Sequence, residues 1–194
     1  AYTNAEWIPS VVIEEEKGGY DMMKYLLSMG HREIGIIGGR ADNIHTQKRL
    51  LGIQKAMFEE QVPYNPGWVR YGAWDRESGY EQAGPLVDAG VSAIFCMADR
   101  MAGGVYDYLE EHGLRAGEDI SVTGFDNQDL SEYIRPALTT MSLPLSEIGH
   151  KAAVMLLERI CGEEKEAEAA DEKAAEIKIP CSIVLRNSVK RKQP

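Results

Sequence analysis

The sequence predicts an α/β protein whose mainly parallel sheet is doubly wound, with helices on both faces. Two short apolar runs, at residues 34–37 and 93–97, have the length and composition of buried strands, and residues 120–123 alternate between apolar and small polar side chains, as a short strand does. Around them lie longer segments in which apolar residues recur every three or four positions, as in amphipathic helices. Strands that alternate with helices in this way form parallel sheets covered on both sides.

Each expected element follows one of these two patterns. In chain order, the strands are expected at residues 11–13, 34–37, 69–71, 93–97, 120–125 and 177–185. The helices are expected at residues 21–29, 43–61, 75–89, 99–112 and 145–161. Gly30 and Gly113 suit helix C-caps, because glycine adopts the left-handed conformation that ends helices. Asp42 or Asn43, and separately Asp99, can supply N-caps.

The helix expected at 75–89 contains a glycine–proline pair, Gly84 and Pro85. Both residues are unfavourable inside a helix, because glycine is flexible and proline lacks the N–H group that the helix needs. We therefore expect this helix to kink or to end early.

Composition excludes several classes of protein. The 194 residues are 44% hydrophobic and 27% charged, near the average for globular domains. No run of about 18 apolar residues predicts a membrane span, and the first residues lack the basic and apolar regions of a signal peptide. The net charge of −10 argues against nucleic-acid binding by this chain, because that function needs a basic surface.

Local composition also bears on chemistry. The cysteines Cys96, Cys161 and Cys181 match no zinc or redox spacing, and they suit a reducing cytosol. The acidic, alanine-rich segment 163–176 is expected to be a loop rather than a helix extension. No metal cluster, complete cofactor loop or pairing of a nucleophile with a base is evident. We therefore expect no cofactor, no metal site and no catalytic residue.

The stretch 119–140 holds the strongest functional pattern. Its strand at 120–125 leads into Asp126 and Asn127, and ligands of open α/β sheets bind beyond the carboxyl ends of the strands. Asp126 would place an acceptor carboxylate at that edge. The alternative is that Asp126 and Asn127 only form a turn, which both residue types favour.

The same stretch carries a family resemblance. DISVTGFDN followed by RPALTT resembles the effector-binding core of the lactose-repressor/galactose-repressor (LacI/GalR) family of bacterial transcription regulators. Further similar motifs follow the family's order: GHREIG from Gly30, RLLG from Arg49, ESGY from Glu77, AIFC from Ala93 and DRMA from Asp99. The similarity covers residues 11–189, which is almost the whole chain.

The resemblance implies a two-lobed, periplasmic-binding-protein-like (type I) domain whose lobes are joined by three crossovers. Residues 1–13 would end the first lobe, and residues 14–142 would form the second, C-terminal lobe. Residues 143–176 would hold a crossover, a helix of the first lobe and the acidic loop, and 177–194 a returning strand and a basic tail. The helix at 145–161 would lack its usual partner, so it would pack back on its own lobe or on another copy.

The family's ligand pocket maps onto five positions of this sequence. Arg49 matches the ligand-binding arginine, whose planar fork can bind two hydroxyls or a carboxylate. Trp74 matches a pocket aromatic that can stack on a sugar ring, and Asp126 matches the acceptor for ligand hydroxyls or ring N–H groups. Asn43 and His45 fall in the loop that lines the pocket in relatives. His45 is not expected to bind a metal, because no second ligand lies at metal spacing.

Two positions depart from the sugar-responsive members that this chain resembles. Many of them have asparagine where this chain has Ala98, and some have a polar residue where it has Leu143. Both changes make the pocket less polar. They permit a sugar other than a standard hexose, a nucleobase-like ligand, or a site that has lost ligand recognition.

The resemblance implies the effector-binding and dimerisation region of a DNA-binding transcriptional regulator. The effector would be a sugar or sugar derivative, and DNA would be bound only by an N-terminal helix-turn-helix outside this chain. The protein would be a cytoplasmic homodimer without membrane contact, acting as repressor or activator. Helix 99–112, with Tyr106 and Tyr108 exposed, and the loop 127–134 are the expected dimer contact.

Two other functions remain as alternatives. A sugar-binding protein of a transport system would share this fold, but the missing signal peptide and the cytosol-like cysteines speak against it. An enzyme on a doubly wound sheet is not supported, because no catalytic set is evident. With most of the first lobe outside the chain, we expect weak sugar affinity for this chain alone.

Overall fold

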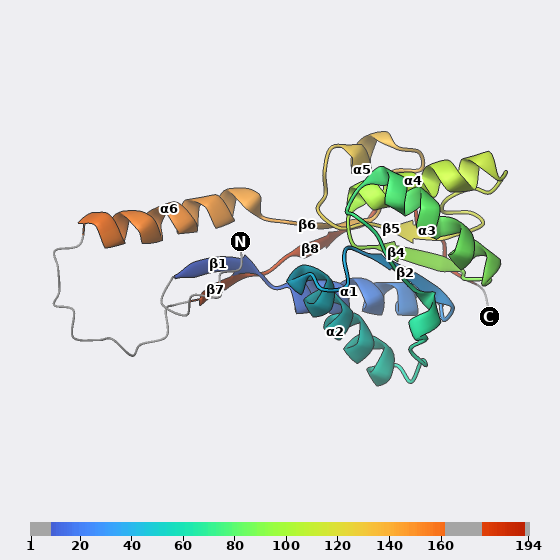
Figure 1. Cartoon of the computed structure of the whole chain (residues 1–194), viewed down its shortest axis with the longest axis horizontal. Helices are drawn as coiled ribbons and strands as arrows, with labels where there is room; N and C mark the ends of the chain where they lie inside the picture. The colour runs from blue at the N-terminus through green and yellow to red at the C-terminus, as the bar shows by residue number, and fades with distance from the viewer. Residues whose placement is uncertain (1–8, 162–175, 193–194) are drawn as a thin grey trace. The chain divides into compact units, whose positions relative to one another are not determined.

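The structure of the chain is a computed structural model that describes residues 9–161 and 176–192 (Figure 1). The acidic segment 163–176, expected to be a loop, lies outside the described residues apart from Glu176, which begins a strand. No helix in the described part of the chain is long and apolar enough to span a membrane.

The chain is divided into two compact units. Unit 1 consists of residues 1–14 and 143–181, and unit 2 consists of residues 15–142 and 182–194. The backbone therefore passes between the units three times, directly before residues 15, 143 and 182. Unit 2 holds all five residues that were predicted to bind a ligand.

A four-stranded parallel sheet forms the centre of unit 2. In spatial order its strands are β3 (Val69–Tyr71), β2 (Ile34–Gly38), β4 (Ala93–Cys96) and β5 (Ser121–Thr123). Ile36 is paired with Val69 on one side and with Phe95 on the other. The central strands β2 and β4 are buried throughout, which explains why their sequences are continuously apolar.

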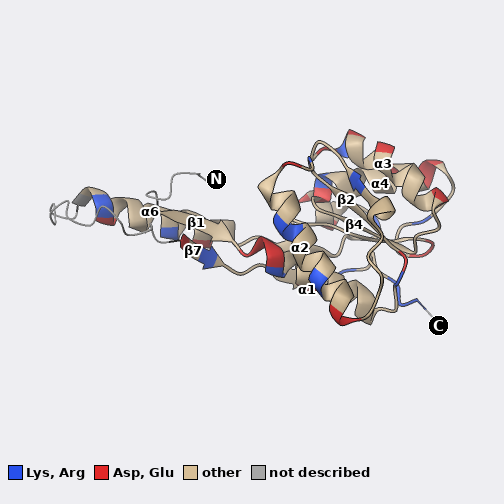
Figure 2. Cartoon of the chain, turned by 60° about the horizontal axis from the view of Figure 1, so that its bottom comes forward, with Lys and Arg blue, Asp and Glu red and all other residues tan. Residues whose placement is uncertain are grey.

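Two pairs of helices cover the two faces of this sheet (Figure 1 and Figure 2). α1 (Glu15–Ser28) packs with α2 (Ile44–Glu59), and α3 (Arg76–Asp88) packs with α4 (Asp99–Glu111). The short helices η1 (Pro66–Trp68) and α5 (Leu130–Tyr133) lie in connections. The predicted doubly wound α/β fold is therefore confirmed.

Glycines allow the helices of each pair to touch backbone to backbone. A Cβ atom at Gly52 of α2 would lie 1.8 Å from the carbonyl oxygen of Glu16 in α1. One at Gly19 of α1 would lie 2.4 Å from the carbonyl oxygen of Arg49 in α2. The second pair repeats this arrangement, because a Cβ at Gly79 of α3 would lie 2.1 Å from a carbonyl oxygen of α4. Any side chain at these positions would force the helices apart.

Two predicted helices differ from those observed. α1 begins at Glu15, six residues earlier than expected, and includes Gly19 of the close contact with α2. α3 does not end early at Pro85, since the N–H of Ala89 still donates to the Pro85 carbonyl at 3.3 Å. Gly84 lies against Tyr108 of α4, where a Cβ atom would be 3.0 Å from the tyrosine oxygen. Packing against Tyr108 therefore explains a glycine in the middle of α3.

The two tyrosines of α4 that were expected to be exposed are half-buried instead. The Tyr106 hydroxyl donates to the carbonyl of Pro136 at 2.9 Å. Tyr108 stacks on His112 with ring centres 4.0 Å apart, and meets the ring of Tyr80 edge-on at 5.5 Å. Both rings therefore pack within unit 2, because amphipathic tyrosines can bury their rings while the hydroxyl finds a partner.

The strand predicted at 177–185 is two strands, separated where the backbone passes between units. β7 (Glu176–Ile179) pairs in parallel with β1 (Ser10–Ile13) in unit 1. β8 (Ser182–Val184) pairs antiparallel with β6 (Thr140–Ser142) in unit 2. Pro180 lies at the break, and proline cannot donate to a strand ladder.

Residues after β8 form the outer neighbour of β5. The N–H of Val122 donates to the Ser188 carbonyl at 2.9 Å, and the Ser188 hydroxyl donates back to the Val122 carbonyl at 2.6 Å. His31, in the loop before β2, is only 3% exposed, and its Nε2 lies 3.0 Å from the Lys190 carbonyl oxygen. Lys192 pairs with Glu33 at 2.5 Å. The basic tail is therefore part of the packed fold of unit 2.

The remaining helix, α6 (Leu145–Cys161), matches its predicted bounds and contacts β1 within unit 1. Its Ile148 and Met155 are half-buried, while Leu145, Leu156 and Ile160 are exposed. The apolar face predicted for this helix is thus only partly covered by the described part of unit 1.

We predict that Gly52→Ala lowers the free energy of unfolding by about 1–3 kcal/mol, because the added methyl group overpacks the α1–α2 contact. Gly149→Ala is the matched control, since a Cβ there would have no heavy atom within 4 Å. This change should leave stability unchanged or raise it by up to about 1 kcal/mol. Urea unfolding followed by circular dichroism measures both. Equal stability of Gly52→Ala and the wild type would contradict the close contact.

Candidate ligand-binding site

The carboxyl ends of the four parallel strands lie at one edge of the unit 2 sheet. β2 and β4 are neighbours there, but the chain leaves β2 for α2 on one face and β4 for α4 on the other (Figure 1). Open α/β sheets bind their ligands at such a topological switch point. The side chains around it form the switch-point site, which consists of Glu15, His45, Arg49, Trp74, Phe125 and Asp126.

Arg49 is the centre of the switch-point site. It extends from the second turn of α2 and is 4% exposed. Its Nε donates to the Glu15 carboxylate at 2.5 Å, and its Nη1 donates to the Met97 carbonyl at 2.5 Å. The guanidinium carbon lies 3.6 Å from the ring centre of Phe125 and 5.6 Å from that of Trp74. These contacts with α1, with the residue that follows β4 and with two aromatic rings fix the guanidinium at the end of the sheet.

Glu15, the first residue of α1, is the buried partner of Arg49 and was not predicted as a site residue. Its side chain is 0% exposed, and its second oxygen lies 2.5 Å from Nδ1 of His45. Burial by itself raises the pKa of Glu15, but the His45 hydrogen bond and the Arg49 charge outweigh burial and hold the pKa below its usual value. Glu15 is therefore ionised at neutral pH, so we assign the hydrogen of this bond to Nδ1 of His45.

Trp74 follows β3 and is held in a strained conformation. Its φ of 66° lies in the left-handed region, which bulky residues rarely adopt. The indole packs over the backbone at the end of β2, since a Cβ at Gly39 would lie 1.9 Å from the Trp74 ring. Such strain costs of the order of 1–3 kcal/mol and is concentrated at ligand sites. Trp74 therefore has a structural feature typical of a binding residue.

Asp126 follows the end of β5 and is strained in the same way. Its φ is 116°, and that of Asn127 is 54°. The Asp126 N–H donates to the Met141 carbonyl at 2.9 Å, which holds the backbone in place. Burial raises the pKa of Asp126 to about 7, with the charges of Asp99 and Glu15 acting in the same direction and that of Arg49 opposing them. The carboxyl group can therefore change its charge near neutral pH.

Asp99 has a different structural role from the expected one. The N-cap of α4 is Ala98, which makes no side-chain capping bond, and Asp99 is the first helical residue. The Asp99 carboxylate accepts from the Thr140 hydroxyl at 2.6 Å and from the N–H of Gln128 at 2.7 Å. Burial raises the pKa of Asp99 to about 6 despite these bonds. Asp99 therefore anchors the loop after Asp126 rather than the helix.

Arg186, beyond β8, anchors the same loop and was not predicted to have a role. Its Nη2 donates to the Asn127 side-chain oxygen at 2.8 Å, and its Nη1 donates to the Leu138 carbonyl at 2.8 Å. Its backbone N–H donates to the Thr139 hydroxyl at 2.9 Å. Arg186 therefore supports the backbone that presents Asp126.

The two other predicted ligand residues lie at the start of α2. Asn43 is the N-cap, as expected, and its side-chain oxygen accepts from the N–H groups of His45 at 2.9 Å and Thr46 at 3.4 Å. This cap fixes the first turn of α2, from which His45 reaches Glu15. Asn43 thus shapes the rim of the site through the backbone, and His45 joins it through Glu15.

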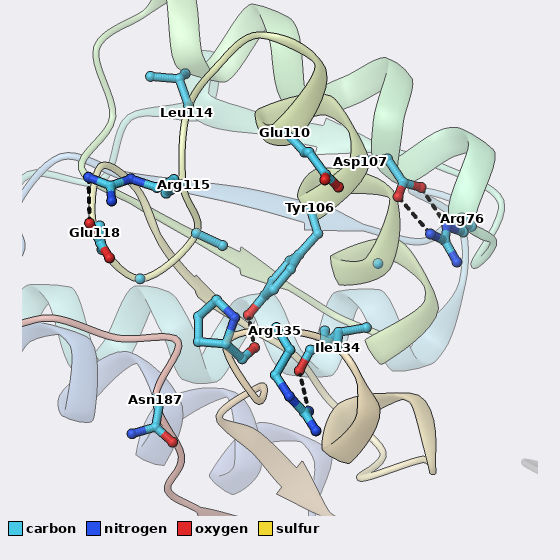
Figure 3. Close-up of a pocket in the computed structure, with 14 residues that line it drawn as sticks. Arg76, Tyr106, Asp107, Glu110, Leu114, Arg115, Glu118, Ile134, Arg135 and Asn187 are labelled. Atoms are coloured by element: carbon cyan, nitrogen blue, oxygen red, sulfur yellow. Dashed lines mark hydrogen bonds and ion pairs between the residues drawn. The ribbon is translucent and has the colours of Figure 1, made fainter.

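A hollow of about 660 Å³ shares no lining residue with the switch-point site (Figure 3). It lies between α4 and the loops 114–118 and 134–136. Arg76 pairs with Asp107 there at 2.5 Å, and Arg115 pairs with Glu118 at 2.5 Å. Because these cations are already paired, their charges do not mark the hollow as an anion site.

The sheet and its switch-point site agree with a known family. A family model described as a periplasmic binding protein-like domain matches residues 23–189. The chain belongs to this family, within the LacI/GalR regulators. The resemblance noted in the sequence is therefore confirmed over most of its length.

The curated relatives of this chain are named as transcriptional repressors. The HTH-type transcriptional repressor PurR of Pasteurella multocida is 39% identical over 176 residues, which are 90% of this chain and 51% of that protein. The chain spans about half the length of the curated relatives it matches.

Solved structures of LacI-type regulators share the fold. A LacI family transcriptional regulator from Enterococcus faecium with bound ribose has a TM-score of 0.88 at 30% identity, over 99% of this chain and 69% of that one. A lac repressor dimer bound to operator and the anti-inducer ONPF has a TM-score of 0.80 at 27% identity, over 93% of this chain and 60% of that one.

We predict that Asp126→Asn raises the melting temperature by a few degrees at pH 8, with the gain disappearing toward pH 4. The pKa of Asp126 is raised to about 7 in the fold, so between its ordinary value near 3.8 and pH 7 the folded state binds more protons than the unfolded state. Wild-type stability therefore falls as pH rises through this window, and the cost is fully present above pH 7. Asparagine remains neutral and avoids that cost.

Asp129→Asn is the control for this experiment, because Asp129 is an exposed residue of the same loop and makes no capping bond. Thermal melts between pH 4 and 8 should show no pH-dependent gain for it. An Asp126→Asn protein that is less stable than the wild type at pH 8 would contradict the raised pKa.

Proposed function

We propose that the switch-point site binds a sugar or sugar derivative, and that the chain is the non-catalytic effector-binding part of a transcriptional repressor. One observation carries this proposal: Arg49 of α2, Trp74 after β3 and Asp126 after β5 gather at one sheet edge. Trp74 and Asp126 are also held at positive φ. Packing alone does not require such strain, whereas a pre-organised ligand site does.

The three side chains offer complementary chemistry for a sugar. The Trp74 ring can stack on the apolar C–H face of a pyranose or furanose. The Asp126 carboxylate can accept hydrogen bonds from neighbouring hydroxyls, and the planar Arg49 group can donate to ring or hydroxyl oxygens. Ala98, buried at the start of α4, has no polar atom in its side chain. Hydroxyl recognition at this edge would therefore depend mainly on Asp126 and Arg49.

The comparisons support a regulator more than a transport protein. The curated relatives are named as transcriptional repressors, and a structural relative at 30% identity holds ribose. A repressor of this kind would work in the cytoplasm. DNA contact would belong to a region beyond the matched half of the relatives, which suits the net charge of −10 of this chain.

The two units support an assignment to the two lobes that the family resemblance implies. Unit 2 would be the second lobe, and unit 1 would belong to the first. The backbone passes between the units three times, as three crossovers between lobes would require. The residues after β8 would then belong to the second lobe.

Dimerisation would use α4 and the loop 127–134, beside the hollow of Figure 3. Tyr133 of α5 lies in this loop and is 74% exposed, so its ring is accessible to a second copy of the chain. Tyrosine is enriched at protein interfaces because its ring gives contact area and its hydroxyl gives a hydrogen bond. Tyr133 is therefore the best-placed described residue for this contact.

The effector proposal predicts that a sugar raises the melting temperature in a concentration-dependent manner, as any ligand of the folded state does. Asp126→Asn and Trp74→Ala should remove most of this rise. Arg76→Ala is the control, because Arg76 pairs with Asp107 on the surface and should leave the rise intact. A sugar whose effect survives both site changes binds elsewhere.

The dimer proposal predicts that Tyr133→Glu shifts a dimer toward monomer in sedimentation velocity, because a buried unpaired carboxylate is costly. Phe58→Glu is the matched control, since Phe58 is 84% exposed on α2, on the opposite face of the sheet. It should leave the dimer unchanged. Equal behaviour of the two variants would reject α5 as part of the interface.

A further inference from the structure

Glu15 occupies the place where an anionic ligand group would bind Arg49. A carboxylate or phosphate binds a guanidinium through two parallel N–H groups, either Nε with one Nη or both Nη groups together. Nε of Arg49 is already bound to Glu15, and Nη1 is bound to the Met97 carbonyl. An anion that binds through Nε would therefore have to displace Glu15, and one that binds through both Nη groups would have to displace the Met97 carbonyl.

The bond between Glu15 and Arg49 is well protected. Side-chain exposure is 0% for Glu15 and 5% for Arg49. His45 binds the second oxygen of Glu15, so both carboxylate oxygens have a partner and the side chain cannot swing away without losing both bonds. The Phe125 ring, 3.6 Å from the guanidinium carbon, covers one face of Arg49. A ligand anion would have to displace a carboxylate that is already in place.

The other charges at this edge also disfavour an anion. Asp126 lies near Arg49, and Asp99 lies close enough for its charge to act on Asp126. The cations that face these groups are Arg49, the exposed Arg100, and Arg186 on the side of Asp99. A phosphate close to Arg49 would therefore approach a set of three buried or half-buried carboxyl groups, and like charges at short range repel strongly where water is scarce.

We infer that Glu15 is a specificity-determining residue, a built-in counter-anion that keeps phosphate and carboxylate groups away from Arg49 and restricts the switch-point site to uncharged or cationic ligands. Neutral sugars and amino sugars meet this condition, whereas sugar phosphates, sugar acids and nucleotides do not. The inference rests on the proposed effector role of the same site, and it narrows the class of effector.

The experiment follows the side-chain NMR signals of Arg49 Nε and the His45 ring during titration with inorganic phosphate. The wild type should show no saturable change at these atoms. Glu15→Gln keeps the size of the side chain and an oxygen acceptor but removes the charge. It should bind phosphate at Arg49. Its dissociation constant should be at least about tenfold lower than that of the wild type, if the wild type binds phosphate there at all. Adding Arg49→Gln should abolish this binding.

Glu16→Gln is the matched control. It removes the same charge one residue away, from an exposed side chain of α1, and should gain no phosphate binding. If Glu15→Gln does not fold, the smaller Glu15→Ser serves the same test. Wild-type phosphate binding at Arg49 as tight as that of the variant would overturn the inference. So would a folded Glu15 variant that gains no phosphate binding, because Glu15 would then be purely structural.

The outcome separates this inference from the effector proposal. If no sugar binds the wild type but Glu15→Gln gains phosphate at Arg49, charge exclusion by Glu15 stands and the sugar proposal fails. If a sugar phosphate binds the wild type through Arg49, an effector site exists and the role given to Glu15 is wrong.

Discussion

A guanidinium group can be buried at the end of a sheet only if an anion is fixed beside it, and this constraint determines the arrangement of the switch-point site. The desolvation of either charge alone costs several kcal/mol, so losing one partner of such a pair typically destabilises a protein by about 3–5 kcal/mol. Glu15 supplies the anion, the Met97 carbonyl supplies a second acceptor, and Phe125 supplies a polarizable face. Arg49 is therefore as much a structural centre as a candidate binding residue.

The position of Glu15 follows from the glycines of the α1–α2 contact. Gly19 lies against the carbonyl group of Arg49 itself, and Gly52 lies against that of Glu16, next to the charged pair. Helices that touch through their backbones bring the first turn of α1 within hydrogen-bonding distance of α2. Bulkier residues would separate the two charges, and their attraction decreases as that distance grows. Residues with no side chain thus determine the geometry of the most polar contact in the site.

The strands and most helix ends could be predicted because their signals are local: continuous apolar runs, helical periodicity, and glycine or asparagine caps. The three candidate residues Arg49, Trp74 and Asp126 were chosen from motifs that match the family, and the structure brings them together at one sheet edge. Glu15 could not be predicted, because it stands among three consecutive glutamates that resemble a solvated charge run, and only a contact 34 residues away distinguishes it. Arg186 was missed for the same reason, since its partners lie 48 and 59 residues away in the sequence.

The docking of residues 186–192 has a consequence for the way the protein is made. Unit 2 is discontinuous, and its last segment, residues 182–194, is synthesised only after residues 143–181 have been added to the growing chain. Until then the outer edge of β5 lacks the backbone partner that Ser188 provides, and the loop presenting Asp126 lacks the Arg186 anchor. Domains generally fold as units while the chain is being translated. The switch-point site can therefore reach its final form only once nearly all of this chain has been translated.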